Sequence, residues 1–220
     1  MPPMNAADAQ RVGVAILARA PIAGQAKTRL IPHLGAAGAA ALQRWLLRRT
    51  VTAAIAADVG PVILWCTPEP DHPEFAACAA LGPLELRRQP DGDLGRRMHG
   101  AVAEASAEGG TLVIGTDCPE LSPALLRQAA DSLRLRQAIV IPAEDGGYVL
   151  IGLRQPAWQV FAAVDWGSER VMEQTRARLN SLHWNWSEFS PLWDVDRAED
   201  FARLATRFPE TGAFADHPAN

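Results

Sequence analysis

The chain has 220 residues, of which 48% are hydrophobic and 21% are charged, and its formal net charge is −4. This length can fill one core, so we expect a single domain over residues 1–220 with its core at about 12–208. A mildly acidic chain without a basic run is a poor candidate for nucleic-acid binding. No apolar run approaches the roughly 20 residues that cross a bilayer, which argues against a membrane partner.

The three cysteines, Cys66, Cys78 and Cys118, form no CxxC pair and are odd in number. This pattern favours a reducing compartment and argues against a disulfide framework or a zinc site. Residues 1–11 lack a basic segment followed by an apolar core, so they do not resemble a signal peptide. We therefore expect a cytoplasmic protein, present as a monomer or a small homo-oligomer.

Strand and helix patterns alternate from residue 12 onward. Helices are predicted at about 36–57, at 72–81, from Leu94 onward, and after Ser122, which fits an N-cap followed by Pro123 at the first helical position. Short apolar runs are typical of strands covered on both faces, and they stand at 12–17, 62–66, 84–88, 111–115 and 138–142.

The rest of the chain continues the alternation. Residues 143–147 form a turn into a sixth strand at 148–153. Ser168 is expected to cap a helix, a further strand is expected at 183–186, and a last helix precedes a tail that should be loose after Pro209. Alternating elements predict an α/β fold, a three-layer α/β/α sandwich around a mostly parallel sheet.

The loop after the first strand carries Arg19, Lys27 and Arg29 and is punctuated by Pro21 and Gly24. Lys27 is the only lysine of the chain. Lysine is a compact point charge whereas arginine is a broad fork, so the two are not interchangeable at a tight phosphate site. The loop is therefore predicted to hold phosphate groups.

Four aspartates follow predicted strands or precede the last helix: Asp117, Asp145, Asp194 and Asp196. Ligands of open α/β sheets bind beyond the carboxyl ends of the strands. Carboxylates near a cationic loop suit Mg²⁺ or Mn²⁺ bound to a diphosphate. Any one of these aspartates alone is better interpreted as a helix cap or turn former, but their shared location favours the metal site.

Simpler motifs do not fit. A single glycine, Gly24, precedes Lys27 and Thr28, so the loop is not a Walker loop. No G-x-S-x-G exists, which argues against a hydrolase elbow. Cys118 stands beside Asp117, whose charge would raise the pKa of the thiol, so we interpret Cys118 as structural.

Taken together, five ordered motifs resemble a bacterial family of uncharacterised glycosyltransferase-A-like proteins, some of them named for arsenosugar biosynthesis. The resemblance covers about residues 12–205 and implies the nucleotide-diphospho-sugar transferase fold. The motifs are Ala18-Arg-Ala-Pro-x-x-Gly-x-x-Lys-Thr-Arg-Leu30, Gly92-Asp-Leu-Gly-x-Arg-Met98, Gly115-Thr-Asp-Cys-Pro-Glu-Leu121, Asp145-Gly-Gly-Tyr-x-Leu-Ile-Gly-Leu153 and Asp194-Val-Asp196.

The resemblance implies roles on the donor side. Asp117 and Asp196 would bind the metal, with Asp194 as a weaker candidate. Two positions depart from the family pattern, because Arg19 replaces a more usual lysine and Arg197 a usual threonine. The residues implied in nucleotide binding are Arg19, Pro21, Gly24, Lys27, Thr28, Arg29, Gln89, Gly92, Asp93, Leu94 and Arg97.

The turn after the fifth strand is the expected acceptor side. It consists of Asp145, Gly146, Gly147 and Tyr148, and the paired glycines permit a close backbone approach. The alternative interpretation is an ordinary hairpin turn with Tyr148 at the start of a strand. Two further residues, Trp166 and Ser168, are candidates for a wall of this side, although most of the seven tryptophans should be in the core.

The resemblance implies a metal-dependent transferase in which Lys27, Asp117 and Asp145 are catalytic. A glycosyltransferase would use a nucleotide sugar and a small-molecule acceptor. A nucleotidyltransferase would use a nucleoside triphosphate and a small phosphorylated or acidic acceptor, and would release pyrophosphate. A phosphatase of the haloacid-dehalogenase type is suggested by Asp194-Val-Asp196, but would need that pair after the first strand. A non-catalytic nucleotide-binding module is the remaining alternative.

Overall fold

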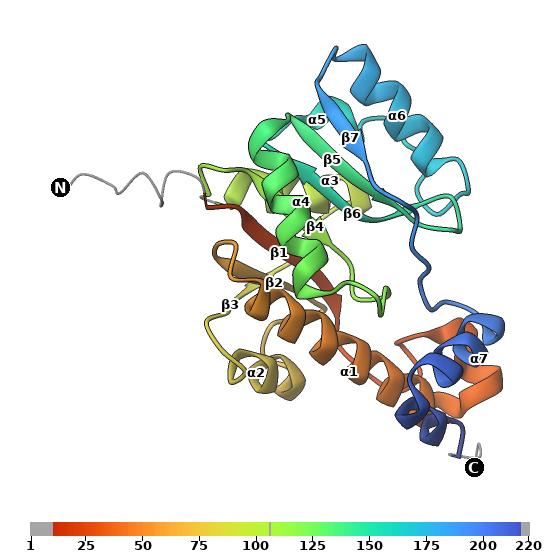
Figure 1. Ribbon diagram of the computed structural model, residues 1–220. Coiled ribbons are helices and arrows are strands. Elements are labelled where there is room, and N and C mark those ends of the chain that lie inside the picture. Colours follow the sequence, from red (N-terminus) through yellow and green to blue (C-terminus); the bar gives the residue numbers. More distant parts are fainter. Residues whose placement is uncertain (1–10, 106, 217–220) are drawn as a thin grey trace.

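The computed structural model describes residues 11–105 and 107–216. The expectation that residues 1–11 are no signal peptide therefore falls, except for Arg11, outside the described part. Within that part the apolar runs form one seven-stranded sheet in the order β3-β2-β1-β4-β6-β5-β7 (Figure 1). The strands are β1 (Gly13–Arg19), β2 (Val62–Thr67), β3 (Glu85–Arg88), β4 (Thr111–Ile114), β5 (Ala138–Pro142), β6 (Tyr148–Leu153) and β7 (Trp186–Glu188).

The sheet is mostly parallel. β1 pairs in parallel with β2 and β4, β2 with β3, and β5 with β7. β6 is antiparallel to both β4 and β5, and it forms a hairpin with β5 through residues 143–147. The prediction of a mostly parallel sheet is confirmed, and the carboxyl ends of β1, β2 and β4 meet at one edge.

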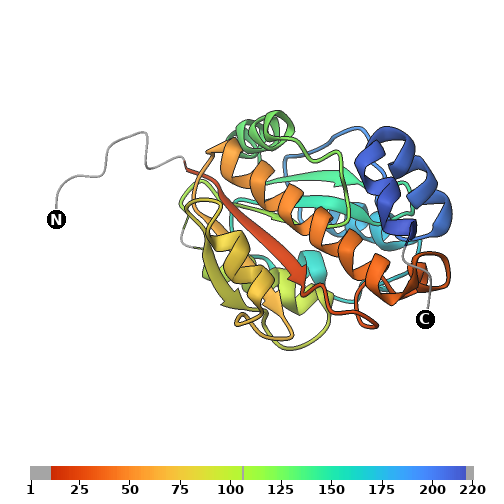
Figure 2. The same ribbon diagram turned by 90° about the horizontal axis from the view of Figure 1, so that it is seen from below.

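Helices cover both faces of this sheet and complete the three predicted layers (Figures 1 and 2). One face is covered by α1 (Ile31–Ala57), α2 (Pro73–Ala79) and α4 (Pro123–Leu135). The other face is covered by α3 (Leu94–Glu104), α5 (Trp158–Phe161) and α6 (Val171–Ser181). The described helices include none that is long and apolar enough to span a membrane.

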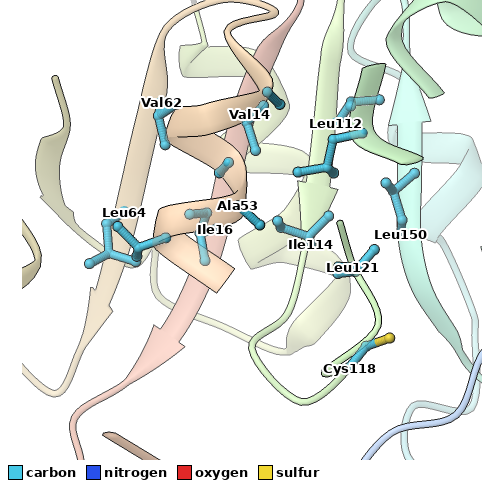
Figure 3. Packing of buried hydrophobic residues seen from close by; sticks show 14 of the residues in the cluster. Val14, Ile16, Ala53, Val62, Leu64, Leu112, Ile114, Cys118, Leu121 and Leu150 are labelled. Carbon is cyan, nitrogen blue, oxygen red and sulfur yellow. The ribbon is translucent and has the colours of Figure 1, made fainter. Parts of the chain in front are cut away.

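The alternation of side chains along β1 divides the core between the two faces, because successive residues of a strand point in opposite directions. Val14 and Ile16 pack toward α1, whereas Ala15 packs on the α3 side. Figure 3 shows the first of these clusters, where Ala53 of α1 lies among Val14, Ile16 and Ile114.

Ser122 and Ser168 were both expected to cap helices, and the structure bears on both expectations. The Ser122 Oγ accepts a hydrogen bond from the N–H of Leu125 at 3.2 Å, which confirms the cap of α4. The expectation that Ser168 caps the next long helix is wrong. α6 begins at Val171 after Arg170, and the Ser168 Oγ accepts from the N–H of Arg170 at 3.3 Å, within the preceding turn.

The strand expected at 183–186 lies further along the chain, at Trp186–Glu188. His183 has a positive φ of 53°, which ends the turn after α6 and cannot continue a strand. The N–H of Asn185 donates to the Gln137 side-chain oxygen at 2.6 Å, and regular pairing with β5 starts only at Trp186.

The expectation of a loose tail after Pro209 is wrong for the described residues. Pro209–Asp216 form a 3-10 helix, η3, which follows α7 (Ala198–Arg207). Thr211 is fully buried, and Phe214 packs against a cluster of α1 and α7 side chains that includes Leu42 and Leu204. Figure 1 shows α7 and the residues after it beside the first half of α1. Residues 217–220 lie outside the described part.

We expect Gly38→Ala to destabilise the protein, because a Cβ at position 38 would stand 2.3 Å from the carbonyl oxygen of Phe214. Overpacking of this kind costs about 1–3 kcal/mol, and the free energy of unfolding in urea measures it. Gly212→Ala is the matched control, since a Cβ there meets nothing within 4 Å. Equal stability of the two variants would contradict the docking of η3 on α1.

Candidate active site

A cleft of about 620 Å³ opens at the carboxyl ends of β1 and β4, beside the turn between β5 and β6. Lys27 from the loop after β1 and Asp117 from the end of β4 line it. The turn contributes Asp145, and the segment before α7 contributes Asp194 and Asp196. The cationic loop and the aspartates that are separated in sequence therefore share one cleft at one edge of the sheet.

Lys27 ties three segments together. Its backbone is left-handed, with φ 48° and ψ 45°, just before the short helix η2 (Thr28–Leu30). Its side chain is 5% exposed, and Nζ stands 2.6 Å from Asp117 Oδ1 and 2.7 Å from the carbonyl oxygen of Val195. The Val195 N–H in turn donates to the carbonyl oxygen of Asp117 at 2.9 Å. A strained non-glycine residue that is held by the surrounding structure is typical of functional sites.

Arg29 and Asp196 form a second ion pair, which also joins the region after β1 to the segment before α7. Arg29 is the more exposed partner, and the hydrogen bond to Asp196 is the main reason why its pKa is raised. Asp200 fixes the segment before α7, because its Oδ2 accepts from the N–H groups of Asp196 and Arg197 at 3.1 and 2.7 Å. Arg197 is the residue before α7 and is not among the described residues that line the cleft.

Asp194 is partly buried and lies among other charged groups of the cleft. Burial raises its pKa to about 6, with further contributions from the charges of Asp145 and Asp117 and an opposing one from Lys27. Asp194 therefore stands near two other carboxylates, whereas Asp196 is matched by Arg29. Asp194, the weaker metal candidate by resemblance, lines the same cleft as Asp117 and Asp196.

The implied nucleotide-binding residues divide into two groups. Asp93 has a structural role, because its Oδ1 caps α3 by accepting the N–H of Arg96 at 2.8 Å. Among the described residues, those of the set that line the cleft are Arg19, Lys27, Thr28, Arg29, Gln89, Leu94 and Arg97, and those that do not are Pro21, Gly24, Gly92 and Asp93.

Gln89 connects the cleft wall that contains Arg97 to the sheet through hydrogen bonds. Its Nε2 donates to the carbonyl oxygens of Ala18 and Trp65, each at 3.0 Å, which joins the ends of β1 and β2. Its Oε1 accepts from Arg97 at 3.4 Å, and Arg97 Nε donates to the carbonyl oxygen of Gly92 at 3.0 Å. Gln89 thus holds the guanidinium of Arg97 at the cleft wall.

Of the implied acceptor residues, Asp145, Gly147, Tyr148, Trp166 and Ser168 line the cleft. Asp145 Oδ1 accepts the N–H of Gly147 at 2.8 Å, and Tyr148 begins β6, so this segment is also the hairpin turn of the alternative interpretation. The Tyr148 hydroxyl donates to Met98 Sδ at 3.5 Å, and burial raises the pKa of that hydroxyl.

Gly146 does not line the cleft among the described residues, because it packs against the next loop. A Cβ at this position would stand 2.2 Å from the carbonyl oxygen of Glu169, and its φ is +92°. Its own carbonyl oxygen accepts from the N–H of Met172 at 2.8 Å. Gly146 thereby joins the hairpin turn to the start of α6.

One residue that joins elements of the site, Gln43, was missed by sequence reasoning. Gln43 of α1 is buried, and its Nε2 donates to the carbonyl oxygen of Arg19 and to Thr116 Oγ1, both at 3.2 Å. Thr116 lies beside Asp117, so Gln43 joins the carboxyl ends of β1 and β4. The available signal was a polar side chain within the apolar stretch around Leu42 of a helix, where a buried amide needs partners.

Cys118 lines the cleft but is nearly buried, and desolvation raises the pKa of its thiol to about 12. The thiolate is the nucleophilic form of cysteine. Cys118 is therefore suited to packing and not to nucleophilic attack at neutral pH.

Two carboxylates of the cleft are candidates for holding a divalent ion together with a phosphate ligand. In the described part of the chain, no group of three His, Cys, Asp or Glu side chains is arranged to hold an ion. Asp117 and Asp194 nevertheless interact through their charges. Hard cations take carboxylate and phosphate oxygens, so Asp117 and Asp194 could hold Mg²⁺ or Mn²⁺ if phosphate oxygens completed the coordination.

Comparison with known proteins identifies a matching family. The sequence model of a family described as "Uncharacterized protein conserved in bacteria (DUF2064)" matches residues 50–168, which is more than half of the chain. The search of curated proteins found no match.

Solved structures share the fold. A proposed nucleotide-diphospho-sugar transferase from Desulfovibrio desulfuricans G20 is 26% identical, with a TM-score of 0.82 over 93% of this chain and 96% of that chain. The 4-diphosphocytidyl-2C-methyl-D-erythritol synthase of Anaerococcus prevotii DSM 20548 is 11% identical, with a TM-score of 0.63 over 94% and 100%. Rv0371c of Mycobacterium tuberculosis H37Rv, in complex with manganese, is 20% identical, with a TM-score of 0.55 over 89% and 97%.

Proposed function

The chain belongs to this bacterial family, DUF2064, and on this premise we propose that it is a transferase that uses a nucleotide-activated donor, most simply a nucleotide sugar. The convergence of Lys27, Asp117 and Asp194 in one cleft at the carboxyl edge of the sheet supports this function. The fold shared with the Desulfovibrio and Anaerococcus proteins supports a transferase of this general class.

The ion pairs of the cleft indicate how a donor diphosphate would be held. Lys27 and Arg29 are now matched by Asp117 and Asp196. When phosphates enter, the two cations can turn to phosphate oxygens, and Asp117 and Asp194 would then be available to hold a divalent ion. A bound Mg²⁺ or Mn²⁺ supplies Lewis-acid stabilisation of the charge on the leaving phosphate. Lys27 and Arg29 stabilise the same charge by preorganised electrostatics.

A thermal-shift screen of nucleotides and nucleotide sugars, with and without Mg²⁺ or Mn²⁺, tests donor binding. A ligand that binds only the native state stabilises it by mass action. We expect the largest increase in Tm from one nucleotide sugar together with the metal. The proposal fails if no nucleotide shifts Tm under either condition.

Nucleotidyl transfer is the second candidate, because the Anaerococcus relative is a synthase named for a cytidyl product. In the first loop Pro21 and a single Gly24 stand where many nucleotidyltransferases carry a Gly-Gly pair, which favours glycosyl transfer. Release of pyrophosphate from a nucleoside triphosphate would instead identify nucleotidyl transfer. Binding of donors without turnover across many acceptors would indicate a nucleotide-binding module.

Asp145 is the proposed base. In glycosyl transfer the acceptor oxygen bonds to the anomeric carbon, the bond from that carbon to the diphosphate breaks, the nucleotide leaves, and the hydroxyl proton passes to the carboxylate. Asp145→Asn should lower kcat by about 10²–10⁴-fold, the usual contribution of a general base. It should leave the nucleotide-induced change in Tm intact, since Asp145 lies on the acceptor side. Unchanged turnover would remove Asp145 as the base.

A further inference from the structure

The loop between α5 and α6 contributes one turn to the wall of the cleft. The turn runs from Asp165 to Ser168, and its last three residues line the cleft. The N–H of Ser168 donates to the carbonyl oxygen of Asp165 at 3.1 Å, and Gly167 has a φ of +86°. This hydrogen bond, with a glycine of positive φ at the third position, is typical of a type II turn. We call the segment the 165–168 turn.

The 165–168 turn has two hydrogen-bond donors that can meet a ligand. The N–H of Gly167 donates to no acceptor among the described residues. The Ser168 Oγ accepts from the N–H of Arg170 at 3.3 Å, and its own proton has no acceptor in the same part of the chain. A Cβ at Gly167 would meet nothing within 4 Å, so another molecule can approach the backbone there closely. N–H and O–H groups of this kind recognise oxygen atoms.

Packing fixes only one part of this turn. The indole of Trp166 lies on α3, where a Cβ at Gly95 would stand 2.8–3.0 Å from three of its ring atoms. Tyr148 meets the same indole edge to face at a centroid distance of 6.4 Å. Gly167 stands in open space on the side where a Cβ would point, and glycine samples more backbone conformations than any other residue. Without a further tether, this turn would pay conformational entropy when it binds a ligand.

Gln174, in the first turn of α6, supplies such a tether. Its Oε1 accepts the backbone N–H of Asp165 at 2.8 Å, and its Nε2 donates to Asp165 Oδ2 at 3.0 Å. The same carboxylate pairs with Arg170. Neither Gln174 nor Asp165 is among the described residues that line the cleft. Gln174 can therefore act on the cleft only through the turn that it holds.

The start of α6 is also joined to the hairpin turn that contains Asp145. The N–H of Met172 donates to the carbonyl oxygen of Gly146 at 2.8 Å, and a Cβ at Gly146 would stand 2.2 Å from the carbonyl oxygen of Glu169. One short stretch, residues 169–174, thus contacts both the hairpin turn and the 165–168 turn. Gln174 therefore helps to set where the 165–168 turn stands relative to Asp145.

We propose that Gln174 is a positioning residue, which holds the 165–168 turn in the conformation that binds an oxygen atom of the acceptor through the Gly167 N–H and the Ser168 hydroxyl. The inference rests on the proposed function, because it takes this side of the cleft as the acceptor side of a transferase. Preorganisation strengthens binding by lowering the cost of ordering the site. The effect of Gln174 therefore falls on the KM of the acceptor, and not on donor binding.

Backbone ¹⁵N relaxation tests the tether without a known substrate. The order parameter of the Gly167 N–H should be about 0.85, as in rigid backbone, in the wild-type protein and below about 0.6 in Gln174→Ala. Gln174→Glu places two carboxylates together and should also loosen the turn. Adding Asp165→Asn to Gln174→Glu restores a donor–acceptor pair and should recover the rigid value.

Gln128→Ala is the matched control, because Gln128 is exposed on α4, which covers the other face of the sheet. It should leave the order parameter of Gly167 unchanged. A flexible Gly167 in the wild-type protein, or a rigid one in Gln174→Ala, would overturn the inference.

Transfer kinetics test the acceptor role of the turn. The donor is the most stabilising nucleotide sugar, and glucose, galactose, mannose and glycerol are the probes for a hydroxyl acceptor. Gln174→Ala and Ser168→Ala should each raise the KM of the accepted probe by roughly 2–10-fold, the effect of one neutral hydrogen bond, with little change in kcat. Ser168→Ala should leave Gly167 rigid, since it removes a contact and not the tether.

Three outcomes separate this inference from the proposed function. An unchanged KM in both variants would remove the acceptor role of the turn. Donor binding by the wild-type protein without transfer to any probe would also remove it, and would favour the nucleotide-binding module. If no nucleotide stabilises the protein, the proposed function fails alone, and the relaxation result still decides whether Gln174 positions the turn.

Discussion

Lys27→Ala should abolish the nucleotide-induced increase in Tm and lower donor turnover by about 10²–10³-fold, the usual loss when one preorganised donor to a developing anion is removed. Lys27 is the nearly buried cation of the cleft, with Asp117 and the carbonyl oxygen of Val195 as its partners. Without it, Asp117 would repel the phosphates, and the segment before α7 would lose one of its ties to the loop.

Two further variants distinguish the loss of the Lys27 ammonium group from the general loss of one positive charge. Arg11→Ala removes one positive charge at the opposite, amino end of β1, where Arg11 forms an exposed pair with Asp58 at 3.3 Å, and it should leave nucleotide binding unchanged. Lys27→Arg keeps the charge but places a broad guanidinium where the lysine side chain is 5% exposed, so it should restore little. If Lys27→Ala binds nucleotide and turns over donor as the wild-type protein does, the loop after β1 is not the phosphate-binding loop.

Asp194→Asn should remove the metal-dependent part of nucleotide binding, whereas Asp196→Asn should weaken it less. Asp194 interacts with Asp117, and Asp196 is engaged by Arg29. Loss of a metal ligand should cost at least about 10–100-fold in metal affinity, the range known for residues that only support ligands. Titration of each variant with Mn²⁺ in the presence of nucleotide measures the difference.

Asp194→Asn should also stabilise the ligand-free protein. The pKa of Asp194 rises from 3.8 to about 6 on folding, so its ionised form opposes folding, and stability falls as pH increases through this interval. Asp194→Asn should therefore raise Tm by on the order of a few degrees above pH 6. The gain should vanish below pH 3.8, where the carboxyl is protonated in both states.

Asp58→Asn is the charge-matched control, because Asp58 is 85% exposed and remote from the cleft. It should change neither Tm nor metal binding. If Asp196→Asn loses the metal response and Asp194→Asn keeps it, the assignment from the sequence would stand, and the electrostatic argument for Asp194 would be wrong.

The sequence predicted those elements of the fold that local signals alone determine. Continuous apolar runs marked β1, β2, β4 and β5, because strands covered on both faces need no polar side. Ser122-Pro123 marked the start of α4 for a similarly local reason. Prediction failed at Ser168, at 183–186 and after Pro209, where turns and packing against distant segments decide which residues become regular.

Within the candidate site, sequence motifs selected Lys27, Asp117 and Asp145, and the structure places all three in one cleft. The resemblance ranked Asp196 above Asp194, but it could not show that Asp196 is paired with Arg29, an arginine 167 residues away in the sequence. The motifs also passed over Gln43, whose two partners lie at the ends of different strands, and they gave no role to Gly95, whose small size matters because Trp166 packs on it.

The amino-acid sequence by itself determined the alternation of strands and helices, the family and the residue types of the cleft, because apolar periodicity and loop chemistry are written along the chain. Tertiary structure alone decided which charges are paired and which carboxylates from distant segments line the same cleft. Electrostatic energy depends on distance and burial in space, and neither is encoded in the separation of residues along the sequence.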